Sequence, residues 1–232
     1  MRIKTIQIII AIGFSLMTFA QETKGSFTKE VKVKLSLNYI LQLPENQKEK
    51  FPLLVFLHGS GERGTDLELV KNHSPFTYQH LIPSPVAILA PQCPENVWWD
   101  TTALYQLILE MSEKYNIDKS RIYLTGLSMG GWGTWKLAEE HSELFAAIAP
   151  VCAPVDRMML INADKLKDMP LKIYHGALDD VVLPTDSIEM YQKLKGINKT
   201  AELILFPDDN HNSWDSTYSN PKFYEWLLAQ HK

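Results

Sequence analysis

The stretch that decides the fold is Gly126-Leu127-Ser128-Met129-Gly130, a serine between two glycines in the pattern G-x-S-x-G. Residues 121–125 before it (R-I-Y-L-T) are largely apolar and β-branched, which predicts a buried strand. Residues 132–141 after it carry apolar side chains at helical spacing, which predicts a helix. A serine on a tight turn from strand to helix is presented at the end of the strand, as a nucleophile must be.

The glycines of this turn have a steric reason. A side chain at Gly126 or Gly130 would crowd the neighbouring strand or helix, because the turn is tight. The helix that follows directs its free N–H groups and the positive end of its dipole toward Ser128, where an oxyanion would form. So short a pattern also occurs by chance. The assignment of Ser128 as a nucleophile therefore depends on the predicted strand and helix around it and on its partner residues.

Length and charge limit the class of protein. The chain has 232 residues, 45% of them hydrophobic and 22% charged, which suits one domain with a large core. The formal net charge of −4 gives no electrostatic reason to expect a nucleic-acid partner. The sequence does not indicate an oligomeric state.

The first twenty residues have the pattern of a secretory signal. Arg2 and Lys4 give a basic start, residues 8–20 are mostly apolar, and Thr18-Phe19-Ala20 supplies small residues for cleavage after Ala20. About 13 residues are too few for a membrane span, which needs about 20, so no membrane anchor is expected. We therefore predict a signal peptide over 1–20, a single domain over 21–232, and a secreted or periplasmic protein.

Strand-like and helix-like segments alternate along the rest of the chain. Strands are predicted at 31–43, 52–57, 86–90, 121–125, 145–149, 171–174 and 201–206, and helices at 101–115, 132–141, 184–195 and 221–231. We expect Thr101 or Thr102 to cap the first of these helices and Asn220 to cap the last. This alternation predicts an α/β fold with a doubly wound, mostly parallel sheet, helices on both faces, and residues 31–43 at an edge.

Residues with side chains suited to catalysis follow four of the predicted strands. In parallel sheets such residues gather at the carboxyl ends of the strands. Here those ends carry His58-Gly59-Ser60, Ser128, Asp179 and His211. The order serine, aspartate, histidine supplies a nucleophile, an orienting carboxylate and a base at one edge of the sheet.

The motifs as a set resemble the α/β-hydrolase superfamily, and more narrowly the secreted esterases and "predicted peptidases" near the feruloyl esterases and polyhydroxybutyrate-depolymerase-like esterases. The matching segments are spread over nearly all of the chain after the predicted signal. They are F-L-H-G-S-G-E-R-G (56–64), A-P-Q-C-P (90–94), W-W-D (98–100), T-G-L-S-M-G-G-W-G-T-W (125–135), H-G-A-L-D-D-V-V (175–182) and N-H-N-S-W (210–214).

The resemblance implies a catalytic triad of Ser128, Asp179 and His211. Its pattern H-G-x-x-D-x-x-V selects Asp179 over the adjacent Asp180. Before the histidine the family usually has glycine; Asn210 stands there instead, and asparagine also tolerates a left-handed backbone.

An oxyanion hole needs two N–H donors. We expect one from the backbone of Met129 and the other from Ser60, with Gly61 as the alternative. We expect Glu62 and Arg63 to pair and stiffen this loop, with contact to the substrate as the alternative. We interpret His58 and His175 as structural residues that bond to nearby backbone.

Tryptophans and cysteines complete the predictions. Trp98, Trp99 and Trp214 are candidate substrate-binding residues because they follow strand ends, whereas Trp132 is expected in the core. Cys93 and Cys152 should be free and mostly buried, since two intervening strands would separate their strand ends by about 14 Å. No ligand spacing suggests a metal, and no cofactor is expected.

We therefore expect a secreted serine carboxylesterase that forms an acyl-enzyme, with acetyl or feruloyl esters of plant polysaccharide as substrates implied by the resemblance. A serine peptidase of the prolyl-oligopeptidase kind is an alternative, although the chain lacks a long gating insertion. Dienelactone hydrolases share the fold but use cysteine, whereas Ser128 stands at this turn. A catalytically inactive, carbohydrate-binding protein on the same fold is a third alternative.

Overall fold

The computed structural model describes residues 22–232, so the predicted signal peptide and its cleavage point at Ala20 lie outside the described residues. Residues 35–232 form one compact unit, and residues 22–34, which contain no helix or strand, are grouped apart from it. The predicted domain start at residue 21 also lies outside the described residues. No helix among residues 22–232 is long and apolar enough to cross a membrane.

Within residues 22–232, seven strands form one sheet in the order β1-β3-β2-β4-β5-β6-β7. β1 is antiparallel to β3 and lies at the edge, and all other neighbours are parallel. The strands are β1 (Asn38–Gln42), β2 (Phe51–Leu57), β3 (Ala87–Gln92), β4 (Ile117–Leu127), β5 (Ala147–Val151), β6 (Lys172–Gly176) and β7 (Glu202–Phe206). This is the α/β-hydrolase type of sheet that the sequence predicts.

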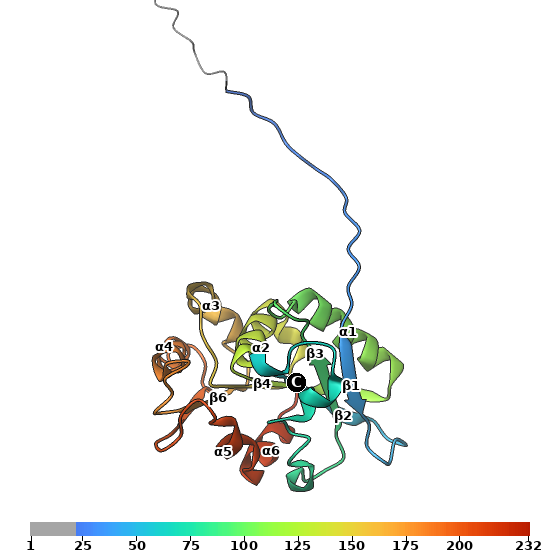
Figure 1. Cartoon of the computed structure of the whole chain (residues 1–232), viewed down its shortest axis with the longest axis vertical. Coiled ribbons are helices and arrows are strands. Elements are labelled where there is room, and N and C mark those ends of the chain that lie inside the picture. The colour runs from blue at the N-terminus through green and yellow to red at the C-terminus, as the bar shows by residue number, and fades with distance from the viewer. Residues whose placement is uncertain (1–21) are drawn as a thin grey trace, which may run out of the picture. The chain divides into compact units, whose positions relative to one another are not determined.

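Helices cover both faces of the sheet (Figure 1). They are α1 (Thr101–Lys114), α2 (Met129–Glu140), α3 (Arg157–Asn162), α4 (Pro184–Leu194), α5 (Trp214–Tyr218) and α6 (Pro221–Leu228). Successive side chains of β2 enter two different cores: Leu53 and Val55 pack with α1 and α2, while Leu54 and Phe56 pack with α5 and α6. The unbroken apolar run of β2 follows from burial on both faces.

Several local predictions differ from the structure. The edge strand covers only residues 38–42 of the predicted 31–43. Helix α1 is capped by Asp100, whose carboxylate accepts from Ala103 N at 3.1 Å, and not by a threonine. The cap of α6 is Asn220, as predicted. The short helices α3 and α5 were not predicted from the sequence pattern.

The cysteines behave as strand order requires. β3, which precedes Cys93, and β5, which precedes Cys152, are separated in the sheet by β2 and β4. Both thiols are buried and free, so the predicted absence of a disulfide is confirmed.

Candidate active site

Ser128 lies on a strained turn between β4 and α2. Its φ of 53° and ψ of −117° are unusual for a residue with a side chain, at a cost on the order of 1–3 kcal/mol. Backbone hydrogen bonds fix the turn: Ser128 N donates to Val151 O and Trp132 N donates to Ser128 O, each at 3.0 Å.

The glycines permit this geometry. A Cβ at Gly126 would overlap the carbonyl of Gly130, and a Cβ at Gly130 would overlap the carbonyl of Leu57 on β2. Both steric expectations from the sequence therefore hold, and the close contact of α2 with β2 presents Ser128 at the sheet edge.

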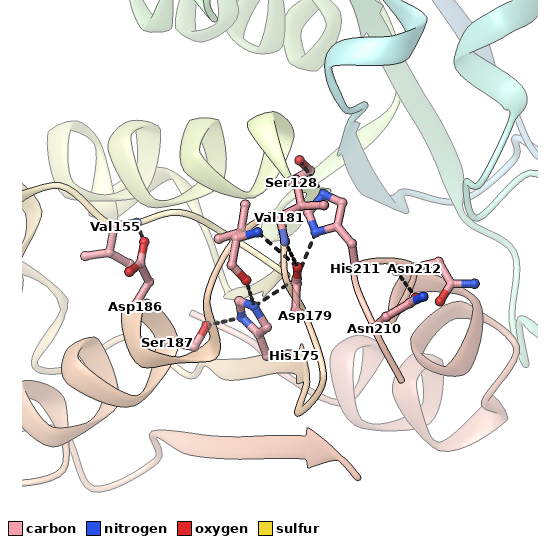
Figure 2. Close-up of polar contacts among 11 residues, drawn as sticks. Ser128, Val155, His175, Asp179, Val181, Asp186, Ser187, Asn210, His211 and Asn212 are labelled. Carbon is pink, nitrogen blue, oxygen red and sulfur yellow. Dashed lines mark hydrogen bonds and ion pairs between the residues drawn. The ribbon is translucent and has the colours of Figure 1, made fainter. Parts of the chain in front are cut away.

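The structure brings Ser128, His211 and Asp179 into one hydrogen-bonded chain (Figure 2). His211 Nε2 lies 3.0 Å from Ser128 Oγ, and His211 Nδ1 lies 2.8 Å from Asp179 Oδ2. Because an ionised carboxylate only accepts hydrogen bonds, Nδ1 carries the hydrogen and Nε2 of neutral His211 is free to take the serine proton. This is the geometry of a nucleophile, a base and an orienting acid.

Asp179, and not the exposed Asp180, makes these contacts. The Asp179 side chain is fully buried. Its Oδ1 accepts hydrogen bonds from the backbone N–H groups of Val181 and Val182, each at 2.9 Å. These donors favour the ionised carboxylate and hold its second oxygen toward His211.

The loops that carry Asp179 and His211 are in direct contact. A Cβ at Gly176 would overlap the backbone oxygens of Asp209 and Asn210, so only glycine allows this approach. Leu178 N also donates to Asp209 O at 2.9 Å. Among the described residues, the non-glycine positions with positive φ do not include Asn210, so the expected left-handed backbone is not used there.

His58 orients the loop that follows β2. Its ring is buried, with Nε2 2.9 Å from Cys93 N and Nδ1 2.6 Å from the carbonyl oxygen of Gly59. Since a backbone N–H can only donate and a carbonyl can only accept, Nε2 accepts and Nδ1–H donates. Burial lowers the pKa of His58 to about 4, so the ring is neutral at neutral pH. This bonding agrees with its predicted structural role.

The direction of the Gly59 carbonyl matters for Ser60. Carbonyl and N–H of one trans peptide point in opposite directions, so the N–H of Ser60 points away from the buried His58. Ser60 and Met129 each begin a helix, Ser60–Glu62 and α2, and their N–H groups therefore have no acceptor within it. Both expected oxyanion donors are thus available in the backbone geometry.

Two side chains, Arg63 and Gln92, secure this loop. Arg63 donates to Ser60 O at 3.0 Å and to Val97 O at 3.3 Å, and Gln92 donates to Glu62 O at 2.9 Å. No ion pair joins Glu62 to Arg63 within residues 22–232, which corrects the expected pairing. Glu62 lies beside His58 instead, with Oε2 at 3.9 Å from Nδ1, and burial raises the pKa of Glu62. Side-chain hydrogen bonds to backbone carbonyls therefore stiffen the loop, in place of the expected ion pair.

The predicted substrate-binding tryptophans lie in different environments. Trp98 is 54% exposed and its ring meets that of Trp132, one turn after Ser128, edge to face at 5.1 Å. Trp214 is half-buried, with its ring 5.4 Å from that of His211. Trp99 is only 4% exposed and packs on His58 within the core, so it is unavailable to a substrate, contrary to expectation.

Sequence reasoning missed two residues near the site. Trp132 was expected in the core but is partly exposed, with Nε1 3.3 Å from Asp156 Oδ2. His175 was expected to bond to nearby backbone, and its Nε2 does lie 2.9 Å from Val182 O, but the same atom also lies 3.1 Å from Asp179 Oδ2. For Trp132 the signal was its position one helical turn after Ser128, and for His175 it was the H-G-x-x-D spacing to Asp179.

Fold and site define an α/β-hydrolase, and the comparison with known families is more specific. The sequence profile of the Dienelactone hydrolase family matches residues 90–219, more than half of the chain, so the chain belongs to this family. At the turn between β4 and α2 this chain has Ser128, where the sequence analysis expects dienelactone hydrolases themselves to have cysteine.

Similar proteins include several esterases. A thermostable esterase of known structure superimposes with a TM-score of 0.78 at 35% identity, over 84% of this chain and 60% of that one. A bifunctional acetylxylan esterase/xylanase of Neocallimastix patriciarum is 35% identical over 101 residues, 43% of this chain and 13% of the relative. Lysophospholipase-like protein 1 of Mus musculus is 27% identical over 207 residues, 76% of this chain and 86% of the relative.

This chain therefore spans only a small part of the acetylxylan esterase/xylanase and about three fifths of the thermostable esterase. The chain therefore belongs to a family named for hydrolases, and several of the proteins similar to it are named esterases.

Proposed function

We propose that the chain is a serine carboxylesterase in which Ser128 is the nucleophile, His211 the general base and then acid, and Asp179 the orienting carboxylate. The observation that carries the proposal is the hydrogen-bonded chain Ser128 Oγ–His211 Nε2 (3.0 Å) and His211 Nδ1–Asp179 Oδ2 (2.8 Å). Such a chain activates a hydroxyl that is otherwise a weak nucleophile.

In the proposed reaction, Ser128 Oγ attacks the ester carbonyl carbon while its proton passes to His211 Nε2. The carbonyl oxygen becomes an oxyanion that accepts hydrogen bonds from the N–H groups of Met129 and Ser60. His211 then gives its proton to the leaving alkoxide, and an acyl group remains on Ser128. Water then attacks the acyl carbon while His211 Nε2 takes its proton. The bond from the acyl carbon to Ser128 Oγ breaks, His211 returns the proton to Oγ, and the acid is released.

For the substrate, we propose small acyl or aryl esters, with acetyl or feruloyl groups on plant polysaccharide as the natural form. The support is the resemblance of the motifs to feruloyl esterases and the similarity to a protein named an acetylxylan esterase/xylanase. The exposed face of Trp98 beside Trp132 is a surface on which an aromatic acyl group or a sugar ring can stack. We further propose that the enzyme is exported, from the signal-like pattern of residues 1–20.

The test is a panel of nitrophenyl acetate, methyl ferulate, acetylated xylan and peptide amides, run with the purified protein and its Ser128→Ala variant. We expect ester cleavage that the variant loses. Peptide cleavage at rates that match the esters would favour the peptidase alternative, and inactivity on every substrate would favour the binding-protein alternative. A fluorophosphonate probe reads the reactivity of Ser128 directly.

Trp98 can be tested on its own. Trp98→Ala should slow cleavage of methyl ferulate several-fold more than cleavage of nitrophenyl acetate, because only the aromatic acyl group loses a stacking partner. Trp226→Ala is the matched control: this tryptophan lies on α6, beside Lys172 at 5.1 Å from the ring, and belongs to the opposite core. An equal effect of Trp98→Ala on both esters would remove Trp98 from the substrate contacts.

A further inference from the structure

His175 is a second histidine in contact with Asp179. It lies on β6 with its side chain fully buried, and its Nε2 is 3.1 Å from Asp179 Oδ2 and 2.9 Å from the carbonyl oxygen of Val182. Figure 2 shows Asp179 contacted by His211 and by His175. The reaction sequence proposed above gives His175 no role, although its ring nitrogen is almost as close to Oδ2 as that of His211.

The protonation of His175 follows from its partners. Nε2 faces a carboxylate and a carbonyl, which only accept hydrogen bonds, so Nε2 carries a hydrogen. Nδ1 lies 2.7 Å from Ser187 Oγ on α4, and this hydroxyl can donate to it. The Nε2–H of His175 therefore points at the turn that follows Asp179.

This arrangement holds the turn from two sides. Val182 gives its N–H to Asp179 Oδ1 at 2.9 Å, while its carbonyl receives the Nε2–H of His175. The same N–H lies beside Oδ2, the oxygen that His211 uses. A hydrogen-bond donor there stabilises negative charge on Oδ2 and reduces the pull of this oxygen on the His211 hydrogen.

We propose that His175 is a positioning residue for the triad acid: through Nε2–H it fixes the 179–182 turn and sets how strongly Asp179 polarises His211. The proposal rests on the proposed roles of Ser128 and His211. Its consequence is that His175 affects the pH at which His211 becomes an effective base, beyond any effect on folding.

Other ionisable groups near Asp179 must be considered. On the β5 side is the thiol of Cys152, whose pKa is raised by burial and also by the charge of Asp179. On α4, Asp186 accepts a hydrogen bond from Val155 N at 3.0 Å and adjoins Ser187. On the β7 loop, Asp209 lies two residues before His211, and Asp180 adjoins Asp179 on the turn. None of these is altered in the variants below, so changes in a pH profile report on residue 175.

The test measures the rate at which a fluorophosphonate probe labels Ser128 between pH 5 and 9, because this rate does not depend on the natural substrate. We compare the wild type with His175→Gln, His175→Asn and His175→Phe. The glutamine amide can place an N–H near the position of Nε2, whereas the asparagine amide is shorter by one methylene. His141→Phe is the matched control, since it keeps the stacking on Tyr105 at 3.8 Å on the far end of α2.

In His175→Phe and His175→Asn we expect labelling to fall about ten- to a hundred-fold, and its pH midpoint to rise by about half a unit, because an unshared Oδ2 holds the imidazolium of His211 more strongly. Glutamine should restore the midpoint and most of the rate. If His175→Phe fails to fold, the glutamine and asparagine pair still carries the comparison. Unchanged midpoints in folded variants, or glutamine no better than asparagine, would overturn the proposal.

The two proposals fail in different ways. If Ser128 is labelled with the expected pH shifts but no ester is cleaved, the role of His175 stands and the esterase proposal falls. If esters are cleaved but the midpoints do not move, the esterase stands and the role of His175 falls. If Ser128 of the wild type resists the probe at every pH, both fall.

Discussion

The carbonyl oxygen of Gly59 lies 2.6 Å from Nδ1 of the buried His58. This hydrogen bond ties the His58 ring to the peptide bond between Gly59 and Ser60, which also carries the N–H of Ser60. Because Cys93 N occupies the second ring nitrogen at 2.9 Å, the ring can hold the peptide only while it is neutral. Protonation of His58 would therefore disturb the proposed oxyanion loop.

The first prediction is that His58 makes the folded protein less stable as the pH is lowered. Its pKa is about 4 in the folded protein, below its ordinary value of 6.5, because burial disfavours the charged ring. Between these values the unfolded chain binds a proton that the folded chain does not, so stability is lost as the pH falls from 6.5 to 4. The loss from this residue is about 3 kcal/mol.

Urea unfolding at several pH values tests this prediction. His58→Gln removes the titrating group while its amide can still donate and accept, so its stability should vary less between pH 4.5 and 7 than that of the wild type. The exposed His80, replaced by glutamine, is the control and should leave the wild-type slope unchanged. An equally steep decline in His58→Gln would show that other groups cause it.

The second prediction concerns the nucleophile. Ser128→Ala should lower ester turnover by about 10⁶ while the protein stays folded, since the whole triad acts through this oxygen. Ester turnover and circular dichroism measured on the same samples separate loss of chemistry from loss of fold. A variant that keeps more than a few per cent of the activity would mean that another residue forms the acyl-enzyme.

The third prediction separates the two adjacent aspartates. Asp179→Asn should lower turnover by about 10⁴, because the amide no longer selects the tautomer of His211 that can accept the serine proton. Asp180→Asn should change turnover little, since Asp180 is exposed and Asp179 makes the contact with His211. The measurement is the turnover of nitrophenyl acetate by both variants, and the reverse ranking would move the acid to Asp180.

Much of the sheet could be predicted because its strands are buried on both faces. The run from Pro52 to Leu57 has no polar residue, and that pattern fits only a central strand. The steric need for Gly126 and Gly130 could also be predicted, since it arises within one turn. Ser128, Asp179 and His211 were brought together by a rule of topology, the shared carboxyl edge of parallel strands.

Other features depend on packing that no local pattern records. Trp98 and Trp99 are adjacent, yet one is exposed and the other lies in the core, because only Trp99 faces His58. Asp100 caps α1 because the helix begins at Thr101, so the cap position falls on the residue before the two threonines. The contact of His175 with Asp179 depends on the turn that returns the chain across the end of β6.

The fourth prediction concerns Glu139, a buried acid on α2 outside the proposed site. Its side chain is 4% exposed and Oε1 has no hydrogen-bond partner. Burial raises the pKa of Glu139 to about 8, against the opposing charge of Lys136. Between pH 4.5 and 8 the unfolded chain releases a proton that the folded chain keeps, so this residue makes the protein less stable as the pH rises through that range.

Glu139→Gln should therefore stabilise the protein at pH 8, by on the order of 3 kcal/mol relative to its effect at pH 5, because glutamine fills a similar volume without a charge. Urea unfolding of wild type and variant at both pH values gives the difference. Glu143→Gln is the control, since that side chain is 71% exposed and its replacement should not alter the pH dependence. If Glu139→Gln has the same effect on stability at pH 5 and at pH 8, the carboxylate of Glu139 is already ionised at pH 5 and is compensated by Lys136 or by Lys165, which also opposes the pKa shift.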